Sequence, residues 1–119
     1  MKNKIEFKML KQVLGCYFHQ DFEYEYSNKE EAIIDICKGY SNEYLINIVI
    51  DINNIIKYTE NEKNLGDFLY EKFHFSLTPQ TPGIDLNTYT EFLENIRDKI
   101  TQHLLKNGFC LNEIKEKIT

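Results

Sequence analysis

The feature that most constrains the fold is an apolar run in the middle of the chain, at residues 45–56. Its apolar residues recur at intervals of three and one, which places them on one face of an α-helix. Many of them are β-branched and individually favour strands, so a strand over residues 45–52 is the alternative. The spacing favours the helix, and Ser41 is placed to cap it. The apolar positions are Leu45, Ile48, Val49, Ile52, Ile55 and Ile56.

Three further helices are predicted around this one. Residues 5–13 carry apolar side chains at helical spacing, and Gly15 is the expected stop. Ser27 is the expected N-cap of the next helix, because Glu30 three positions later completes a capping box. Asn61 is placed to cap a helix that runs to residue 73.

The last third of the chain predicts a loop followed by a long helix. Residues 76–85 hold both prolines and a glycine, which indicates a loop. The helix after it begins at Asp85 or Asn87 and ends at Gly108, and residues 111–118 could add a short final turn. The sequence therefore predicts an all-α bundle of about five helices that forms a single domain over residues 1–119.

The stretch LGCYFHQDFEYEY, residues 14–26, places five aromatic rings, three carboxylates and a histidine within thirteen positions. Phe22, Tyr24 and Tyr26 alternate with glutamates as in a strand, whereas Phe18, Phe22 and Tyr26 also fit one face of a helix. We predict an extended or irregular segment here, following the first helix.

The net charge of the chain, −5, is concentrated in one segment. Residues 17–35 contain six acids and one base, Lys29, whereas the rest of the chain is neutral overall. A local excess of negative charge is repelled by nucleic acid and favours a basic partner protein. The alternative is a solvated face that binds nothing. The six acids are Asp21, Glu23, Glu25, Glu30, Glu31 and Asp35.

Candidate chemistry centres on Cys16, His19 and Asp21. Cys16 and His19 form an isolated C-x-x-H, whereas zinc usually takes four ligands. An acid–base pair of His19 with Asp21 or Glu23 would lack a neighbouring serine nucleophile or an arginine. The sequence favours a buried Cys16 and a half-buried His19 bonded to a carbonyl or a carboxylate. We therefore predict no catalytic residue, no metal and no cofactor, with a metal-binding enzyme as the alternative.

Cysteine usage and the absence of targeting signals indicate a cytoplasmic protein. Cys16, Cys37 and Cys110 are odd in number and widely spaced, so they do not form a disulfide framework. Cys37 falls on an apolar helix face and is predicted to lie in the core. The first residues do not read as a signal peptide, and no apolar run is long enough to span a membrane.

Two segments of the chain resemble the family of immunity proteins of contact-dependent growth inhibition (CdiI type). The first, LKQVLGCYFHQDFEYEYSNKEEAIIDI, is similar to that family's L-x-x-x-L-G-x-Y-F-H-Q-D-[WF] opening, with Phe22 where tryptophan is common. The second, FSLTPQTPGIDLNTYTEFLENIRDKI, resembles its proline- and glycine-bearing loop and the following helix with an aromatic–leucine pair. The resemblance covers residues 10–100. The matching positions in the first segment are Leu10, Leu14, Gly15, Tyr17, Phe18, His19, Gln20, Asp21, Phe22, Glu25, Tyr26 and Ala32.

The resemblance implies a cytoplasmic protein that binds and neutralises the C-terminal domain of a delivered toxin. Many such toxins are nucleases with basic surfaces, which an acidic protein would complement. A small adaptor for another basic protein is the alternative. The residues expected to bind the partner are Asp21, Glu23, Tyr24, Glu25, Glu30 and Glu31. The residues expected to build the structural framework are Leu14, Gly15, Tyr17, Phe18, His19 and Phe22.

Overall fold

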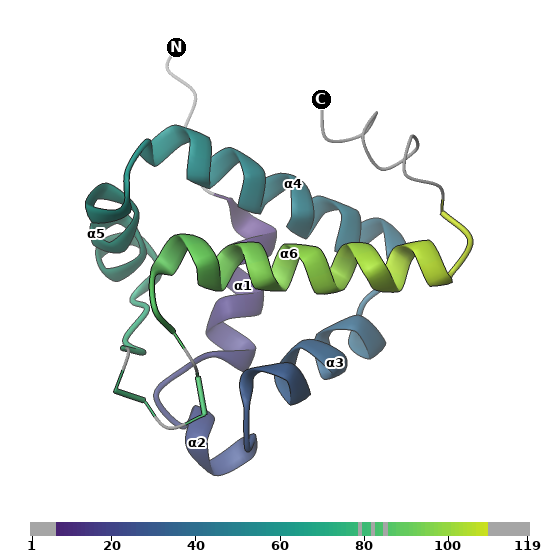
Figure 1. Ribbon diagram of the computed structural model, residues 1–119, viewed down its shortest axis with the longest axis horizontal. Helices are drawn as coiled ribbons and strands as arrows, with labels where there is room; N and C mark the ends of the chain where they lie inside the picture. The colour runs from purple at the N-terminus through teal and green to yellow at the C-terminus, as the bar shows by residue number, and fades with distance from the viewer. Residues whose placement is uncertain (1–6, 79, 82, 85, 110–119) are drawn as a thin grey trace.

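The computed structural model describes residues 7–78, 80–81, 83–84 and 86–109. Within these residues the chain forms helices and no strand, so the predicted all-α fold is confirmed (Figure 1). The strand alternative at residues 45–52 is wrong, because all of them lie in a helix. The turn predicted at residues 111–118 lies outside the described residues. The helices are α1 (Lys8–Tyr17), α2 (Phe22–Glu25), α3 (Lys29–Gly39), α4 (Asn42–Thr59), α5 (Glu62–Phe73) and α6 (Tyr89–Lys106).

The two longest helices, α4 and α6, lie side by side across the molecule, and α1 crosses behind them (Figure 1). α6 packs against α3, α4 and α5, while α1 packs against α3, α4 and α5 from the other side. The apolar stripe predicted for α4 is buried in this core, apart from the half-buried Ile56. The stripe forms a helix because its spacing lets one continuous face contact all of its neighbours.

The helix caps are the local features that the sequence predicted best. The Ser41 side chain accepts the backbone N–H of Tyr44 at 3.2 Å, and the Asn61 side chain accepts that of Asn64 at 2.8 Å, as expected for N-caps.

The capping box of α3 is one residue later than predicted. Asn28, not Ser27, is the N-cap and accepts the N–H of Glu31 at 3.0 Å. Glu31 in turn accepts the N–H of Ser27 at 2.9 Å. Asparagine caps a helix as well as serine does, and Glu31 lies three residues after Asn28, as Glu30 does after Ser27. The sequence therefore fits a capping box at either position.

Three predicted helix boundaries are wrong. α1 begins at Lys8 rather than at residue 5, because Phe7 before it has a φ of 50° and is its N-cap residue. α1 continues through Gly15 to Tyr17, and Gly15 does not adopt the positive φ of a glycine that ends a helix. α6 begins at Tyr89, because Thr88 accepts the N–H of Glu91 at 3.0 Å and acts as its N-cap. Its predicted end is confirmed, since Gly108 follows it with φ of 99°.

The N-terminus of α1 is capped from another helix. Phe7 provides no side-chain cap there, but Asp51 of α4 accepts the backbone N–H of Leu10 at 3.1 Å and also that of Met9. Burial raises the pKa of the Asp51 carboxyl, and these two hydrogen bonds lower it by less. Asp51, in the middle of α4, is therefore the hydrogen-bond acceptor for the N-terminal amides of α1.

We expect Asp51→Ala to lower the free energy of unfolding at pH 7 by about 1–2 kcal/mol, because two helix amides lose their acceptor. Asp51→Asn should lose less, since its oxygen still accepts. With a folded pKa above the unfolded value, wild type binds more protons when folded, so its stability falls as pH rises through that interval. Urea unfolding at pH 4 and pH 7 should show that the free energy of unfolding of wild type, relative to that of Asp51→Asn, is higher at pH 4. Equal stability of wild type and Asp51→Ala would contradict the cap.

Candidate partner-binding surface

The aromatic–acidic stretch contains one helical turn, α2, whose buried side chain, Phe22, packs into the core. Phe22 is fully buried and stacks on Phe18 with ring centroids 5.5 Å apart. Tyr26 packs against Phe22 from the other side at 5.8 Å. The predicted extended or irregular conformation is therefore wrong for Phe22–Glu25, because the four-residue spacing of buried rings prevails over the alternating pattern.

This turn directs its other side chains into solvent. The side chain of Tyr24 is 82% exposed, and Glu23 and Glu25 beside it are also exposed. Asp21 and Glu23 make no side-chain hydrogen bond or ion pair within the described part of the chain. The turn thus presents an aromatic ring between carboxylates, two of which are available to an external partner.

The other carboxylates of the segment are exposed but hold local partners. Glu30 lies 3.3 Å from Lys99 of α6, and Asp35 accepts the hydroxyl of Tyr26 at 2.9 Å. Burial, followed by the Asp35 interactions, raises the pKa of Tyr26 to about 12, so this hydroxyl remains a donor at neutral pH. The acidic face, defined as Asp21, Glu23, Glu25, Glu30, Glu31 and Asp35, therefore has its carboxylates without a partner in the described chain, Asp21 and Glu23, at its α2 end.

Lys29, the single base of the segment, is buried, whereas the acids around it in the sequence are exposed. Its side chain is buried, with Nζ 6.0 Å from the centroid of the Phe92 ring. Its backbone N–H donates to Gly83 of the proline-containing loop at 2.9 Å. The lysine therefore acts in the core beneath the acidic face.

His19 connects α1 to α2 through both ring nitrogens. Nδ1 accepts the backbone N–H of Asp21 at 3.1 Å, and Nε2 lies 3.3 Å from Glu25 Oε1. The half-buried ring bonded to a carboxylate is the environment expected from the sequence. This arrangement positions the two ends of the α2 turn and leaves neither nitrogen free for a ligand.

The cysteines do not join His19 in a metal site. Cys16 is exposed, so its predicted burial is wrong: its position faces outward because α1 continues past it. Cys37 is half-buried against the core, and burial raises the pKa of its thiol. Cys110 lies outside the described residues. In the part of the chain that the structure describes, no three histidine, cysteine or acidic residues lie close enough together to hold a metal ion.

Half of the six framework residues of the sequence motif are buried in the corner between α1 and α2, and Gly15 is exposed. Leu14, Phe18 and Phe22 are buried, whereas Tyr17 is half-buried and packs edge-on to Tyr40 at 6.2 Å. The Tyr17 hydroxyl lies close to Gly39, and a Cβ added at Gly39 would be 3.1 Å from the hydroxyl oxygen. These contacts hold the α2 turn in a fixed place relative to α3.

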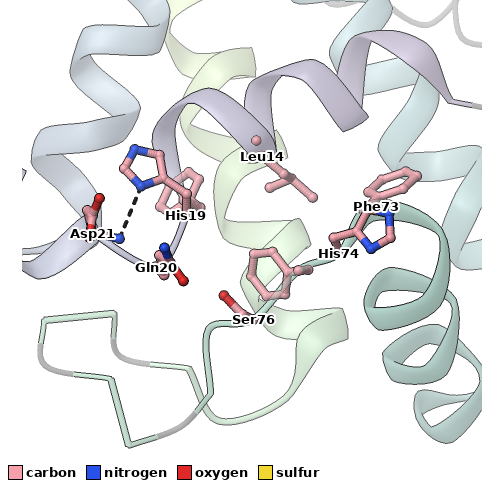
Figure 2. A pocket seen from close by; sticks show the side chains of 10 residues that line it. Leu14, His19, Gln20, Asp21, Phe73, His74 and Ser76 are labelled. Carbon is pink, nitrogen blue, oxygen red and sulfur yellow. Dashed lines mark hydrogen bonds between the residues drawn. The ribbon is translucent and has the colours of Figure 1, made fainter.

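A pocket of about 290 Å³ lies between this corner and the segment that follows α5 (Figure 2). One side is lined by the end of α1 and the residues that follow it: Leu14, Gly15, Phe18, His19, Gln20 and Asp21. The opposite side is formed by Phe73, His74, Phe75 and Ser76. His74 ends α5 in the left-handed conformation with φ of 57°, which turns the chain back toward α1.

Sequence reasoning missed the second side of this pocket. Phe73 was expected as the end of a helix face and residues 76–85 as a loop, but nothing in their spacing indicated contact with residues 14–21. The only local signal is the adjacent pair of aromatic residues, Phe73 and Phe75, around a histidine. Their approach to α1 depends on the left-handed turn at His74.

Comparison with known protein families identifies a match over most of the chain. The sequence model of a family described as CdiI immunity protein matches residues 6–100, which include all of the residues that form the acidic face and the pocket. No curated protein and no solved structure shows a significant match.

Proposed function

The chain belongs to the CdiI immunity protein family, and we propose that it neutralises the toxin domain of its growth-inhibition system by stoichiometric binding. Family membership implies a toxin-neutralising immunity protein with a cognate toxin as its partner. The match over residues 6–100 is the observation that carries the proposal. Immunity proteins are generally not enzymes, and neutralisation by binding requires no catalytic residue here.

The acidic face supports a basic toxin domain as the partner, and we propose a nuclease. A nuclease surface is basic because its substrate is anionic, and an acidic protein is attracted to it over long range. The carboxylates of Asp21 and Glu23 have no partner among the described residues, and Tyr24 offers a large exposed ring beside Glu23 and Glu25. A buried aromatic anchor inside a charged rim is a common arrangement in tight interfaces.

We propose a cytoplasmic protein whose residues 1–119 act as one immunity domain, since the described residues share one hydrophobic core. None of the described helices combines the length and the hydrophobicity needed to cross a bilayer.

Co-expression with the product of the adjacent toxin gene tests the function. We expect that the toxin domain alone arrests growth, that growth is restored when this protein is produced with it, and that the two co-purify in equimolar amounts. Continued arrest in the presence of well-folded, abundant protein would overturn the proposal.

We expect Glu23→Lys to slow association with the toxin domain by about 3- to 10-fold at low salt, because it reverses a carboxylate without a partner in the described chain, at the α2 end of the acidic face. The salt dependence of the association rate should become shallower. Stopped-flow measurements at two salt concentrations provide both values.

The matched control is Glu71→Lys, which makes the same change in net charge at an exposed position on α5. Its association rate should stay close to that of wild type. If both variants slow association equally, the effect belongs to total charge and the role of the acidic face is wrong.

A further inference from the structure

We propose that the pocket between α1 and the segment after α5 receives an arginine side chain of the toxin domain. The inference rests on the proposed function and names the contact that anchors it. The pocket lies at the end of the acidic face, because Asp21 belongs to both (Figure 2). A toxin that docks on Glu23 and Tyr24 would therefore place its surface over the opening.

The size of the pocket suits one side chain. Its volume of about 290 Å³ is at the lower limit for small-molecule sites, which range from roughly 300 to 1,000 Å³. Interfaces often bury an arginine, tyrosine or tryptophan in such a recess, where the surrounding contacts exclude water.

The lining chemistry favours a cation with an apolar stem. Among the described residues that line the pocket there is one acid, Asp21, and no lysine or arginine, and the Asp21 carboxylate is unpaired within the same part of the chain. Gln20 and Ser76 add polar side chains that make no hydrogen bond there. Phe18, Phe73 and Phe75 supply aromatic walls. A guanidinium group is planar, carries five donors and stacks on aromatic rings, which a lysine ammonium matches less well.

The histidines do not oppose this occupant. Nδ1 of His19 accepts the Asp21 N–H, so the proton of the neutral ring is on Nε2, toward Glu25. His74 lies on the opposite wall, where an imidazole nitrogen can accept from a guanidinium donor.

Gly15 provides an independent indication that the space is used. It lies inside α1, where glycine is the poorest helix former after proline. Its φ is not positive, and an added Cβ would meet no atom within 4 Å. Neither backbone conformation nor packing therefore requires glycine here. Gly15 lines the pocket, so a small residue here keeps the space beside the aromatic walls open, whereas a longer side chain would take up part of it.

The test compares Gly15→Leu with Gly15→Ala in complexes with the toxin domain. Both residues are good helix formers, so both variants should be at least as stable as wild type. Gly15→Leu should fill the pocket and weaken binding by about 30-fold or more, whereas Gly15→Ala should stay within about 3-fold. Asp21→Asn, which keeps the shape of the side chain, should also weaken binding. Wild-type affinity of Gly15→Leu would overturn the proposal.

The identity of the occupant is tested by replacing each surface arginine of the toxin domain with alanine. We expect one replacement to weaken binding to wild type strongly and to have little further effect on Gly15→Leu, since that arginine has already lost its site. Coupling to a lysine, aromatic or aliphatic toxin residue instead would overturn the assignment to arginine.

The two proposals fail in different ways. If wild-type protein does not bind the toxin domain, the proposed function is wrong. If wild type and Gly15→Ala bind and protect cells while Gly15→Leu and Asp21→Asn do so equally well, the function stands and the pocket is not the anchor.

Discussion

Phe92→Ala should lower the free energy of unfolding by about 3–5 kcal/mol, the usual cost of removing a fully buried phenylalanine. The Phe92 ring is only 1% exposed and joins three parts of the chain. Its centroid lies 5.0 Å from that of Phe18 and 5.6 Å from that of Phe75, and the Lys29 ammonium lies above its face. A loss of this size is a large fraction of the roughly 5–15 kcal/mol that stabilises a typical domain.

Chemical unfolding of three variants measures this effect. Phe92→Leu keeps most of the apolar volume and should be less destabilised than Phe92→Ala. Tyr70→Ala removes an aromatic ring that is 70% exposed and should change stability by less than about 0.5 kcal/mol. Similar losses for Phe92→Ala and Tyr70→Ala would show that Phe92 does not organise the core.

The position of Phe92 also links stability to the candidate site. Phe18 and Phe75 belong to opposite sides of the pocket, and Phe18 carries the α2 turn through its stack with Phe22. Removing the ring between them should therefore loosen both the pocket and the acidic face. Loss of toxin binding by Phe92→Ala should therefore be compared with the unfolding curve of the same variant, which shows how much of the loss comes from unfolding.

The helical fold was predictable because its evidence is local. The stripe of α4 repeats along a single segment, and the caps Ser41 and Asn61 lie directly before the helices that they start. The exposure of the acids between Asp21 and Asp35 follows from the same principle, since charged residues stay in water unless paired.

The parts that sequence reasoning missed depend on contacts between distant residues. Gly15 is the expected end of α1, but glycine permits the positive φ that ends many helices without requiring it, and Gly15 stays helical. The cap of α1 comes from Asp51, 41 residues away from Leu10, and no pattern within either helix records that pairing. The pocket is similar, because its two sides meet only after α5 has turned back at His74.

The first turn of α6 depends on a second long-range cap, from Glu62 at the start of α5. Its carboxylate accepts the backbone N–H of Tyr89 at 2.7 Å, the N–H of Thr90 at 3.1 Å and the hydroxyl of Thr90 at 2.8 Å. Thr88 accepts the next amide, from Glu91. These two residues thus satisfy the first three N–H groups of the helix, and the carboxylate also opposes the positive end of its dipole.

We expect Glu62→Ala to lower the free energy of unfolding by about 2–3 kcal/mol, because charge-assisted hydrogen bonds are lost and two half-buried amides lose their acceptor. Glu62→Gln should lose less stability, since the glutamine carbonyl oxygen can still accept one of these hydrogen bonds. Its NH₂ group cannot accept a hydrogen bond, so it cannot replace the second carboxylate oxygen. Glu71→Gln, an exposed change on the same helix, should be nearly neutral. Hydrogen exchange should accelerate most at the amides of Tyr89 and Thr90 in Glu62→Ala. Unchanged exchange there, with stability equal to that of Glu71→Gln, would show that α6 starts without this carboxylate.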